Sequence, residues 1–283
     1  MRLLAVAPRA CWPQLRRAAG IRGADLELVV RPAAGAGRDP FDVAGALGGS
    51  GADAALLVAP ARRAPRCLLP APLVAGVPVG ILPAASSADI EAWLGTVTGP
   101  AAPHTTTVMS MALNHYLASG HRLAGMLADR GEVAVRLADR TSRDDLCTHL
   151  ATGPRLAIYI GHGHSRGWCG YRDLDWEHVA AVPIGRPCGV VVALACNTLT
   201  RARGNEPFGC RWVRSGRAAA YLGSAHALRT EANAAFAVVL GGVLAEGPST
   251  LGAALVRVAA VADPLAARAM ASFRIIGDPL APV

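Results

Sequence analysis

Two apolar runs of strand length each end at a side chain that can take part in nucleophilic chemistry. Residues 156–160 lead through Gly161 to His162, and residues 189–195 lead to Cys196. Because the carboxyl ends of parallel strands meet at one edge of a sheet, we expect both side chains there. A thiol attacks as its thiolate, and an imidazole can protonate a leaving amine near neutral pH. The pair therefore predicts acyl transfer, with Cys196 as the nucleophile and His162 as its proton-transfer partner.

Glycines on both sides of His162 support this interpretation. Gly161 and Gly163 allow a sharp bend, and Gly163 leaves its own amide unshielded by a side chain. We predict that the amides of Gly163 and Cys196 donate hydrogen bonds to a developing oxyanion. Taken singly, a cysteine at a strand end is more often structural, and a histidine in a turn is more often an ordinary surface residue. Two of them at the ends of neighbouring apolar strands are far less common by chance.

A metal site is the alternative chemistry in this region. His162, His164 and Cys169 are ligand types at ligand-like spacing. No second paired ligand set follows them, and Cys196 would have to join from another strand. We therefore expect no metal and no cofactor.

The elements that position these residues form two alternations of strand and helix. In residues 1–98 we predict strands at 2–7, 26–31, 54–59 and 77–82 and helices at 12–19, 41–47 and 88–96, the last capped by Ser87. Residues 60–72 hold four prolines and three arginines and are predicted to be a loop. The stretch Gly99–Pro103 is the best boundary between two units.

The second alternation begins after this boundary and contains both reactive side chains. Besides the two runs above, we predict strands at 105–111, 132–138 and 218–222, a closing strand and turn at 273–279, and helices at 121–130, 142–150, 233–245 and 249–262. The predicted caps of the second and last of these helices are Ser142 (or Thr141) and Ser249. Strands that alternate with helices predict a parallel α/β sheet with right-handed crossovers.

Composition and charge exclude several classes of protein. The chain has 283 residues, of which 52% are hydrophobic and 17% charged, so a folded protein with a sizeable core is expected. All 28 basic residues are arginine and the net charge is +8, but no aromatics interleave the arginines as in a nucleic-acid platform. No apolar run reaches the length of a membrane span, and residues 1–8 are too short for a signal-peptide core. Seven scattered cysteines without CxxC spacing indicate reduced thiols in a cytosol.

Several blocks of sequence resemble one known group of enzymes. Residues 160–163 with Trp168, and residues 195–197, resemble the catalytic blocks of the caspase-like (clan CD) cysteine peptidases, most closely the gingipain family. Residues 273–280 resemble the strand and Gly-Asp-Pro turn that closes that family's catalytic unit. Residues 217–252 resemble its CHAT-type relatives.

The resemblance covers about residues 104–280 and implies a fold and a mechanism. The expected fold is α/β: a caspase-like parallel sheet with flanking helices over residues 104–283, preceded by a smaller α/β subdomain over residues 1–99. The expected roles are attack on the peptide carbonyl by Cys196, protonation of the leaving amine by His162, and an oxyanion hole made by the amides of Gly163 and Cys196.

The resemblance also implies where substrate side chains bind. In this clan the first substrate pocket draws on the loop after the first catalytic strand and on the loop after the strand beyond the cysteine. The residues predicted to bind substrate are Asn114, His115, Ser224, Ala225, His226 and Arg229, with Trp168 as a wall of the cleft. Since neither loop contains a carboxylate, cleavage after arginine or lysine is not expected, and Arg229 is a candidate to bind an acidic side chain.

The expected function is therefore that of a bacterial-type, cytoplasmic cysteine endopeptidase. Its expected partner is a protein or peptide substrate, with no nucleic acid and no membrane. Two alternatives stay open at this point. The chain is a catalytically weak or inactive caspase-like binding module, or it is a transpeptidase that uses the same pair of residues, because an acyl-enzyme can be released by an amine as well as by water.

Overall fold

The structure is a computed structural model, and it describes residues 2–30, 47, 50–59, 72–84, 86–99, 104–201 and 206–283. Apart from one residue at the end of each, the helix predicted at 41–47 and the loop predicted at 60–72 lie outside them, as does Cys67. The six described cysteines form no disulfide with one another.

One large sheet runs through the molecule. Its strand order is β2-β1-β3-β5-β14-β13-β12-β8-β6-β7, with β4 paired to β5. The strands are β1 (Arg2–Ala7), β2 (Asp25–Val30), β3 (Ala54–Ala59), β4 (Leu73–Val74), β5 (Val77–Pro83), β6 (Thr105–Ser110), β7 (Glu132–Leu137), β8 (Leu156–Ile160), β12 (Cys188–Leu194), β13 (Ala218–Ser224) and β14 (Phe273–Gly277). All pairs are parallel except β13–β14 and β4–β5. This confirms the predicted mostly parallel α/β sheet.

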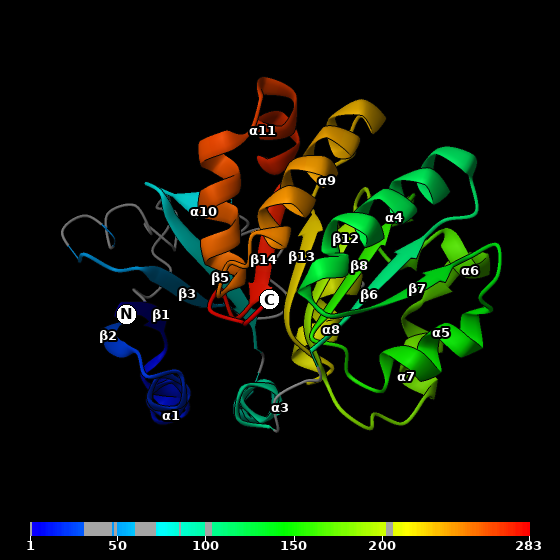
Figure 1. The fold of residues 1–283 in the computed structure, drawn as a ribbon. Helices are drawn as coiled ribbons and strands as arrows, with labels where there is room; N and C mark the ends of the chain where they lie inside the picture. Colours follow the sequence, from blue (N-terminus) through cyan, green and yellow to red (C-terminus); the bar gives the residue numbers. More distant parts are fainter. Residues whose placement is uncertain are drawn as a thin grey trace.

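Helices cover both faces of the sheet (Figure 1). One layer contains α1 (Trp12–Arg22), α3 (Ser87–Thr98), α5 (Arg143–Leu150), α7 (Trp176–Ala181) and α8 (Phe208–Arg214). The other contains α4 (Asn114–Leu127), α9 (Thr230–Ala245), α10 (Leu251–Val261) and α11 (Pro264–Met270). Two short 3-10 turns, η1 (Arg9–Cys11) and η3 (Ala128–Arg130), flank α1 and α4. Because both faces are covered, the central strands are apolar throughout rather than alternating.

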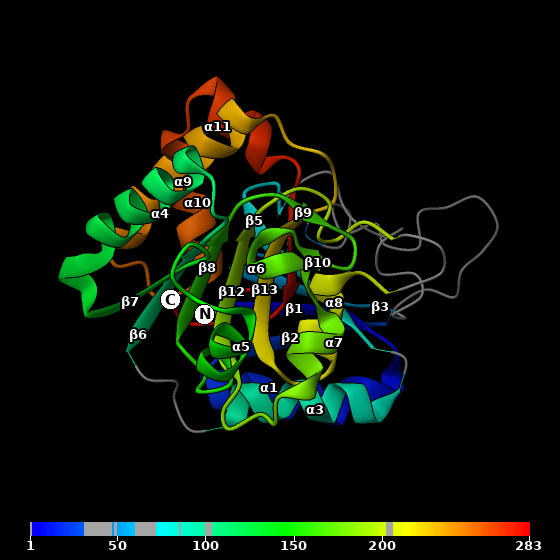
Figure 2. The same cartoon turned by 90° about the vertical axis from the view of Figure 1, so that its right-hand side faces the viewer.

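A second, small sheet follows β8 directly. It consists of β9 (Gly163–His164), β10 (Gly167–Trp168) and β11 (Leu174–Asp175), with the single turn α6 (Gly170–Asp173) between the last two strands. Figure 2 shows β9, β10 and α6 close together at one end of the large sheet. This small sheet carries the residues that follow His162.

Two helix starts differ from the prediction by one residue. The cap of α3 is Ser86, and Ser87 is already helical. The Ser86 side chain accepts from the Asp89 amide, and the Asp89 side chain accepts from the Ser86 amide. The cap of α10 is Thr250 in place of Ser249. In both cases two adjacent residues have hydroxyl side chains that can cap the helix, so the sequence alone does not determine which of them is the N-cap. The predicted cap of α5, Ser142, is confirmed.

Helix α4 begins at Asn114, seven residues before the predicted start at 121. Its N-cap is Leu113, which makes no side-chain cap hydrogen bond, so the sequence carries no signal for this start. The consequence matters for the site, because Asn114 and His115 occupy the first turn of a helix rather than a loop.

The sheet is continuous across the predicted boundary between units. Strand β5 pairs with β14 in parallel through Gly80 and Ile81. The indole Nε1 of Trp93 in α3 also donates to the Ala219 carbonyl of β13 at 3.1 Å. The division into units 1–99 and 104–283 stays a prediction of the sequence. Among the described helices, none is long and apolar enough to span a membrane.

Candidate active site

Two hydrogen bonds fix the backbone of His162, and a third holds one of their donors in place. Its carbonyl accepts from the Tyr159 hydroxyl at 2.9 Å and from the Cys169 amide at 3.1 Å. The Tyr159 oxygen in turn accepts from the Gly170 amide at 3.1 Å. Tyr159 is fully buried and stacks on Trp168, with ring centroids 4.6 Å apart. The sheet core therefore holds the His162 backbone in place while its imidazole remains exposed to solvent.

A tight turn fixes Cys196 at the end of the neighbouring strand β12. Asn197 adopts a left-handed conformation with φ of 58°, which asparagine tolerates better than most residues. The Asn197 amide donates to the His226 carbonyl at 3.1 Å, and the Leu199 amide donates to the Ser224 carbonyl at 2.9 Å. These bonds tie the turn to the loop after β13. Cys196 is half-buried, so it is accessible from solvent.

The Cys196 sulfur lies close to the beginning of helix α9. The Leu228 amide donates to Sγ at 3.2 Å, and the Leu228 carbonyl lies 3.7 Å from the same sulfur. Leu228 comes two residues before the first residue of α9, a 16-residue helix. The Leu228 N–H, next to the beginning of the helix, therefore points at the sulfur.

The His162 imidazole contacts Tyr116. The phenol oxygen lies 3.5 Å from Nδ1, and the two rings meet edge to face with centroids 5.3 Å apart. Burial raises the pKa of Tyr116, and the neighbouring Cys196 and Cys169 raise it further, so the phenol stays neutral in the physiological range. Within the described part of the chain, no carboxylate forms an ion pair with His162. A phenol thus takes the position beside Nδ1.

Backbone contact brings the two reactive turns together. Strands β8 and β12 pair in register, with Ile160 opposite Leu194. A Cβ added to Gly163 would lie 2.9 Å from the Cys196 carbonyl oxygen and 2.9 Å from the Ala195 Cβ. Only glycine permits this approach. Both side chains therefore occupy the same edge of the sheet, at the ends of adjacent strands.

The amides of Gly163 and Cys196 are not used by the surrounding backbone ladders. The bond from the Cys169 amide to the His162 carbonyl makes that residue pair a hydrogen-bonded one in the β9–β10 hairpin. The next pair, Gly163 with Trp168, is then non-hydrogen-bonded, which leaves the Gly163 N–H out of the ladder. Among the described residues, no backbone carbonyl accepts from the Cys196 amide.

The residues predicted to bind substrate fall into two groups. Asn114, His115, His226 and Arg229 are exposed, and Arg229 pairs with Glu231 at 3.9 Å. The prediction is wrong for the side chains of the other three. Trp168 and Ser224 have no exposed surface, and Ala225 is 9% exposed. Trp168 packs in the aromatic core and cannot wall a cleft. The Ser224 hydroxyl bonds the His226 and Ser272 carbonyls instead of facing a substrate.

Sequence reasoning missed the individual roles of Tyr116 and Leu228. Both lie in the two segments that the resemblance pointed to, Tyr116 in the first turn of α4 and Leu228 in the loop after β13, but neither was singled out. Tyr116 had a signal: a tyrosine five residues after the predicted end of the strand at 105–111 is at the correct sheet edge. Leu228 had none, because it acts through its backbone amide.

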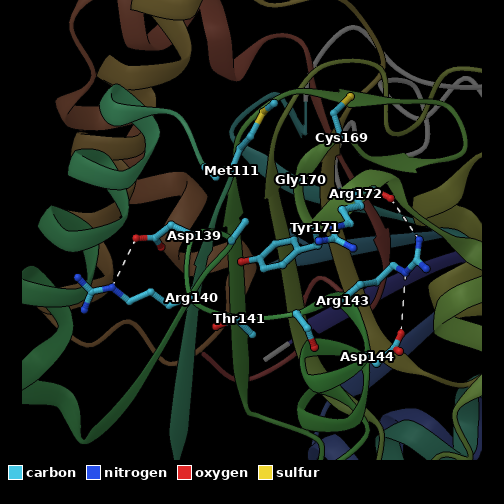
Figure 3. A pocket seen from close by; sticks show the side chains of 13 residues that line it. Met111, Asp139, Arg140, Thr141, Arg143, Asp144, Cys169, Gly170, Tyr171 and Arg172 are labelled. Atoms are coloured by element: carbon cyan, nitrogen blue, oxygen red, sulfur yellow. Dashed lines mark hydrogen bonds and ion pairs between the residues drawn. The ribbon is translucent and has the colours of Figure 1, made fainter.

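A cavity of about 540 Å³ lies beside the site, on the face covered by α5 (Figure 3). The chain after β7, the start of α5 and residues 169–172 line it. Its charged side chains partly pair with one another, as Asp139 does with Arg140 at 3.5 Å. Arg143 donates to the Arg172 carbonyl at 3.2 Å and approaches Asp144 at 3.9 Å. Because Cys169 is both a wall residue and a hydrogen-bond donor to His162, the cavity adjoins the His162 turn.

Comparison with known proteins agrees with this arrangement. The sequence profile of peptidase family C25 matches residues 96–283, about two thirds of the chain. The chain belongs to this family, the gingipain family of clan CD, and is a cysteine-type peptidase. A search among curated proteins gives no match.

Solved structures show the same fold at low sequence identity. The complex of the pro- and mature domains of Porphyromonas gingivalis RgpB matches with a TM-score of 0.73 and 14% identity, over 100% of this chain and 80% of that one. The crystal structure of the Arg-specific cysteine proteinase gingipain R (RgpB) matches with a TM-score of 0.77 and 13% identity, over 100% and 78%. Saccharomyces cerevisiae separase, in its complex with securin, matches with a TM-score of 0.58 and 16% identity, over 82% and 16%. The predicted caspase-like fold and gingipain resemblance are confirmed.

Proposed function

We propose that this chain is an endopeptidase that works through a Cys196–His162 dyad. The Cys196 thiolate attacks the carbonyl carbon of the scissile bond, and the negative charge moves to the carbonyl oxygen. The amides of Gly163 and Cys196 donate to that oxygen. The tetrahedral intermediate collapses as the C–N bond breaks, and His162 protonates the departing amine. Water then hydrolyses the Cys196 thioester, which releases the acid and restores the thiol.

The contact between Gly163 and the Cys196 backbone is the observation that carries this proposal. It supports the proposal because two amides that lack ladder partners lie at neighbouring strand ends, beside one half-buried thiol. The Leu228 amide supports the thiolate, and Tyr116 supports the imidazole. A binding module has no need for amides left without partners next to a thiol, so the arrangement favours turnover over binding alone.

The substrate we propose is a protein or peptide that lies across the end of β8 and β12. Its acyl half contacts the exposed side chains of Asn114, His115, His226 and Arg229. Its leaving half lies on the His162 side, where the cavity of about 540 Å³ adjoins the turn. Because neither loop that faces the acyl half contains a carboxylate, we propose that the residue before the scissile bond is not basic. The unpaired pattern of cysteines supports action in a reducing, cytoplasmic compartment.

Labelling with a peptide that carries a thiol-directed electrophile tests the dyad. We expect rapid modification of Cys196 alone, no modification in Cys196→Ala, and modification at the rate of a free cysteine in His162→Ala. Cys11→Ser is the matched control, because Cys11 is also partly exposed and follows β1, which four strands separate from β12 in the sheet. Equal rates for wild type, His162→Ala and free cysteine would contradict the proposal.

Cleavage-site profiling on a peptide mixture tests the substrate. Wild type and Cys196→Ala are compared, and sites that appear only with wild type define the preference. We expect arginine and lysine to be depleted before the cleaved bond. Enrichment of either would contradict the proposed acyl-side recognition but not the dyad.

A further inference from the structure

A second set of reactive side chains lies beside the His162 turn and has no role in the mechanism above. It consists of His164 in β9, Cys169 after β10 and Asp173 at the end of α6. One ligand atom from each, an imidazole nitrogen, a thiol sulfur and a carboxylate oxygen, lie within 4.8 Å of one another. His164 and Cys169 are half-buried and Asp173 is exposed, so the cluster opens to solvent.

Two local structures bring these residues together. The β9–β10 hairpin places His164 opposite Gly167, and the bond from the Cys169 amide to the His162 carbonyl extends the hairpin by one pair. The chain then reverses through a left-handed turn, since φ is 58° at Tyr171 and Arg172 and 57° at Asp173. Tyr171 anchors that turn, because it is 4% exposed and its hydroxyl donates to the Arg136 carbonyl.

We infer that His164, Cys169 and Asp173 form a binding site for a divalent transition metal of the Zn²⁺ type. Nitrogen, thiolate and carboxylate are the three ligand classes that Zn²⁺ takes in proteins, at about 2.0–2.3 Å. Tetrahedral coordination places ligand atoms about 3.3–3.8 Å apart, so the present spacing needs to close by about 1 Å. A three-residue set leaves the fourth position to water.

Little has to move for the metal to bind. Because Asp173 is exposed, its side chain can rotate toward the other two ligand atoms. His164 Nδ1 now accepts from the Arg166 amide at 3.2 Å, and a metal at Nδ1 takes the place of that donor. The thiol gives up its proton to solvent as the metal–sulfur bond forms. Hard ions such as Mg²⁺ and Ca²⁺ prefer all-oxygen sets and fit this one poorly.

The site is separate from the dyad but linked to it through the backbone. The sulfur of Cys169 belongs to the cluster, whereas its amide donates to the carbonyl of His162. A bound metal thus fixes the segment that positions the imidazole. The inference goes beyond the proposed peptidase function and does not depend on it.

Co²⁺ titration is the test, because a cobalt–thiolate bond gives a charge-transfer band in the near ultraviolet that reports directly on the sulfur ligand. The protein is Cys196→Ala throughout, so that the catalytic thiol cannot bind the metal. We expect a band that saturates at one Co²⁺ per chain and disappears when Zn²⁺ displaces the cobalt. Adding Cys169→Ser removes the band, and adding Cys11→Ser, the matched control, leaves it unchanged.

Two further variants keep the test decisive if Cys169→Ser unfolds. His164→Gln and Asp173→Asn are each expected to weaken Co²⁺ binding by at least about 10-fold, since even a residue that only supports a ligand typically contributes 10–100-fold. Near-ultraviolet circular dichroism of the metal-free proteins checks that each variant is folded. No thiolate band with Cys196→Ala, a band that survives in folded Cys169→Ser, or unchanged affinity in both further variants would overturn the inference.

Discussion

Gly163 is important for the site because it has no side chain. A methyl group there would meet the Cys196 carbonyl oxygen and the Ala195 Cβ, both at 2.9 Å, and these are backbone and core atoms that cannot move aside cheaply. The ends of β8 and β12 can therefore lie this close together only if residue 163 is glycine. Any side chain pushes the Gly163 amide away from the place where the oxyanion forms.

We predict that Gly163→Ala lowers kcat by about 10²–10³, the usual effect of losing one oxyanion donor, while the protein stays folded. Steady-state cleavage of a reporter peptide gives kcat, and thermal unfolding gives stability. Gly125→Ala is the matched control, because a Cβ at Gly125 in α4 meets nothing within 4 Å. An active Gly163→Ala enzyme would argue against this oxyanion hole.

Tyr116 acts on the reaction through His162 and is a positioning residue. We predict that Tyr116→Phe lowers kcat by about 2–10-fold, which corresponds to the 0.5–1.5 kcal/mol of one hydrogen bond. The measurement is kcat and KM separately, with KM expected to stay constant because the phenol contacts the imidazole. Tyr116→Leu should cost more, since it also removes the edge-to-face ring contact. A change confined to KM would instead assign Tyr116 to substrate binding.

At the scale of single residues, the sequence was sufficient to predict the reactive residues that follow strand ends. It was not sufficient to predict residues that contact them from other elements. His162, Gly163 and Cys196 were identifiable because apolar runs lead directly to them. Leu228 was not, since a backbone amide leaves no mark on residue type. Trp168 was misplaced because a tryptophan beside a reactive turn is compatible with a cleft wall and with the core. Only its stacking on Tyr159 decides between the two.

At the scale of elements, long apolar strands were predictable to within one or two residues, and short amphipathic helices were not. Helices α7 and α8 have six and seven residues, too few for a periodic pattern to stand out. Helix α11 was missed although Asp263 caps it and Pro264 follows, a recognisable start signal. The start of α4 had no such signal at all.

Helix α5 contributes a pH dependence through its last turn. Burial, and then the positive charge of Arg136, lower the pKa of His149, whose Nε2 lies 2.9 Å from the Thr107 hydroxyl of β6. The unfolded chain therefore binds a proton at a higher pH, about 6.5, than the folded chain does. Stability from this group is present above that pH and is lost as the pH falls below it.

We predict that His149→Gln flattens the decline in the free energy of unfolding between about pH 6.5 and pH 5. Urea titrations at several pH values measure it. His226→Gln, which changes an exposed histidine, should leave the slope as in wild type. If both variants keep the wild-type slope, another group carries the acid sensitivity.

At the scale of the whole molecule, Arg214 joins the two predicted units. From α8 its guanidinium bonds Glu206 at 2.7–2.9 Å and Asp89 of α3 at 3.3 Å. Both carboxylates are 13% exposed, while Arg214 itself is 38% exposed. The mutual attraction raises the pKa of Arg214, so the guanidinium is charged at every accessible pH.

We predict that Arg214→Ala lowers the free energy of unfolding by about 1–2 kcal/mol, the lower half of the usual range for a charged hydrogen-bond partner, because solvent screens the exposed guanidinium. Chemical denaturation measures the change. Arg229→Ala should lower it by about 0.5 kcal/mol or less, since its pair with Glu231 is long and exposed. Equal losses in the two variants would mean that the Arg214 contacts contribute no more than a surface pair.

The position of β14 has a consequence for how the molecule is made. Residues 273–277 lie between β5 and β13, and both of these strands precede β14 in the chain, β5 by far the more. Until β14 emerges from the ribosome, β5 and β13 each present an unpaired edge, the kind of surface that invites wrong pairing. At that stage the nascent chain has its thiol and imidazole on the strands on one side of the place that β14 later fills.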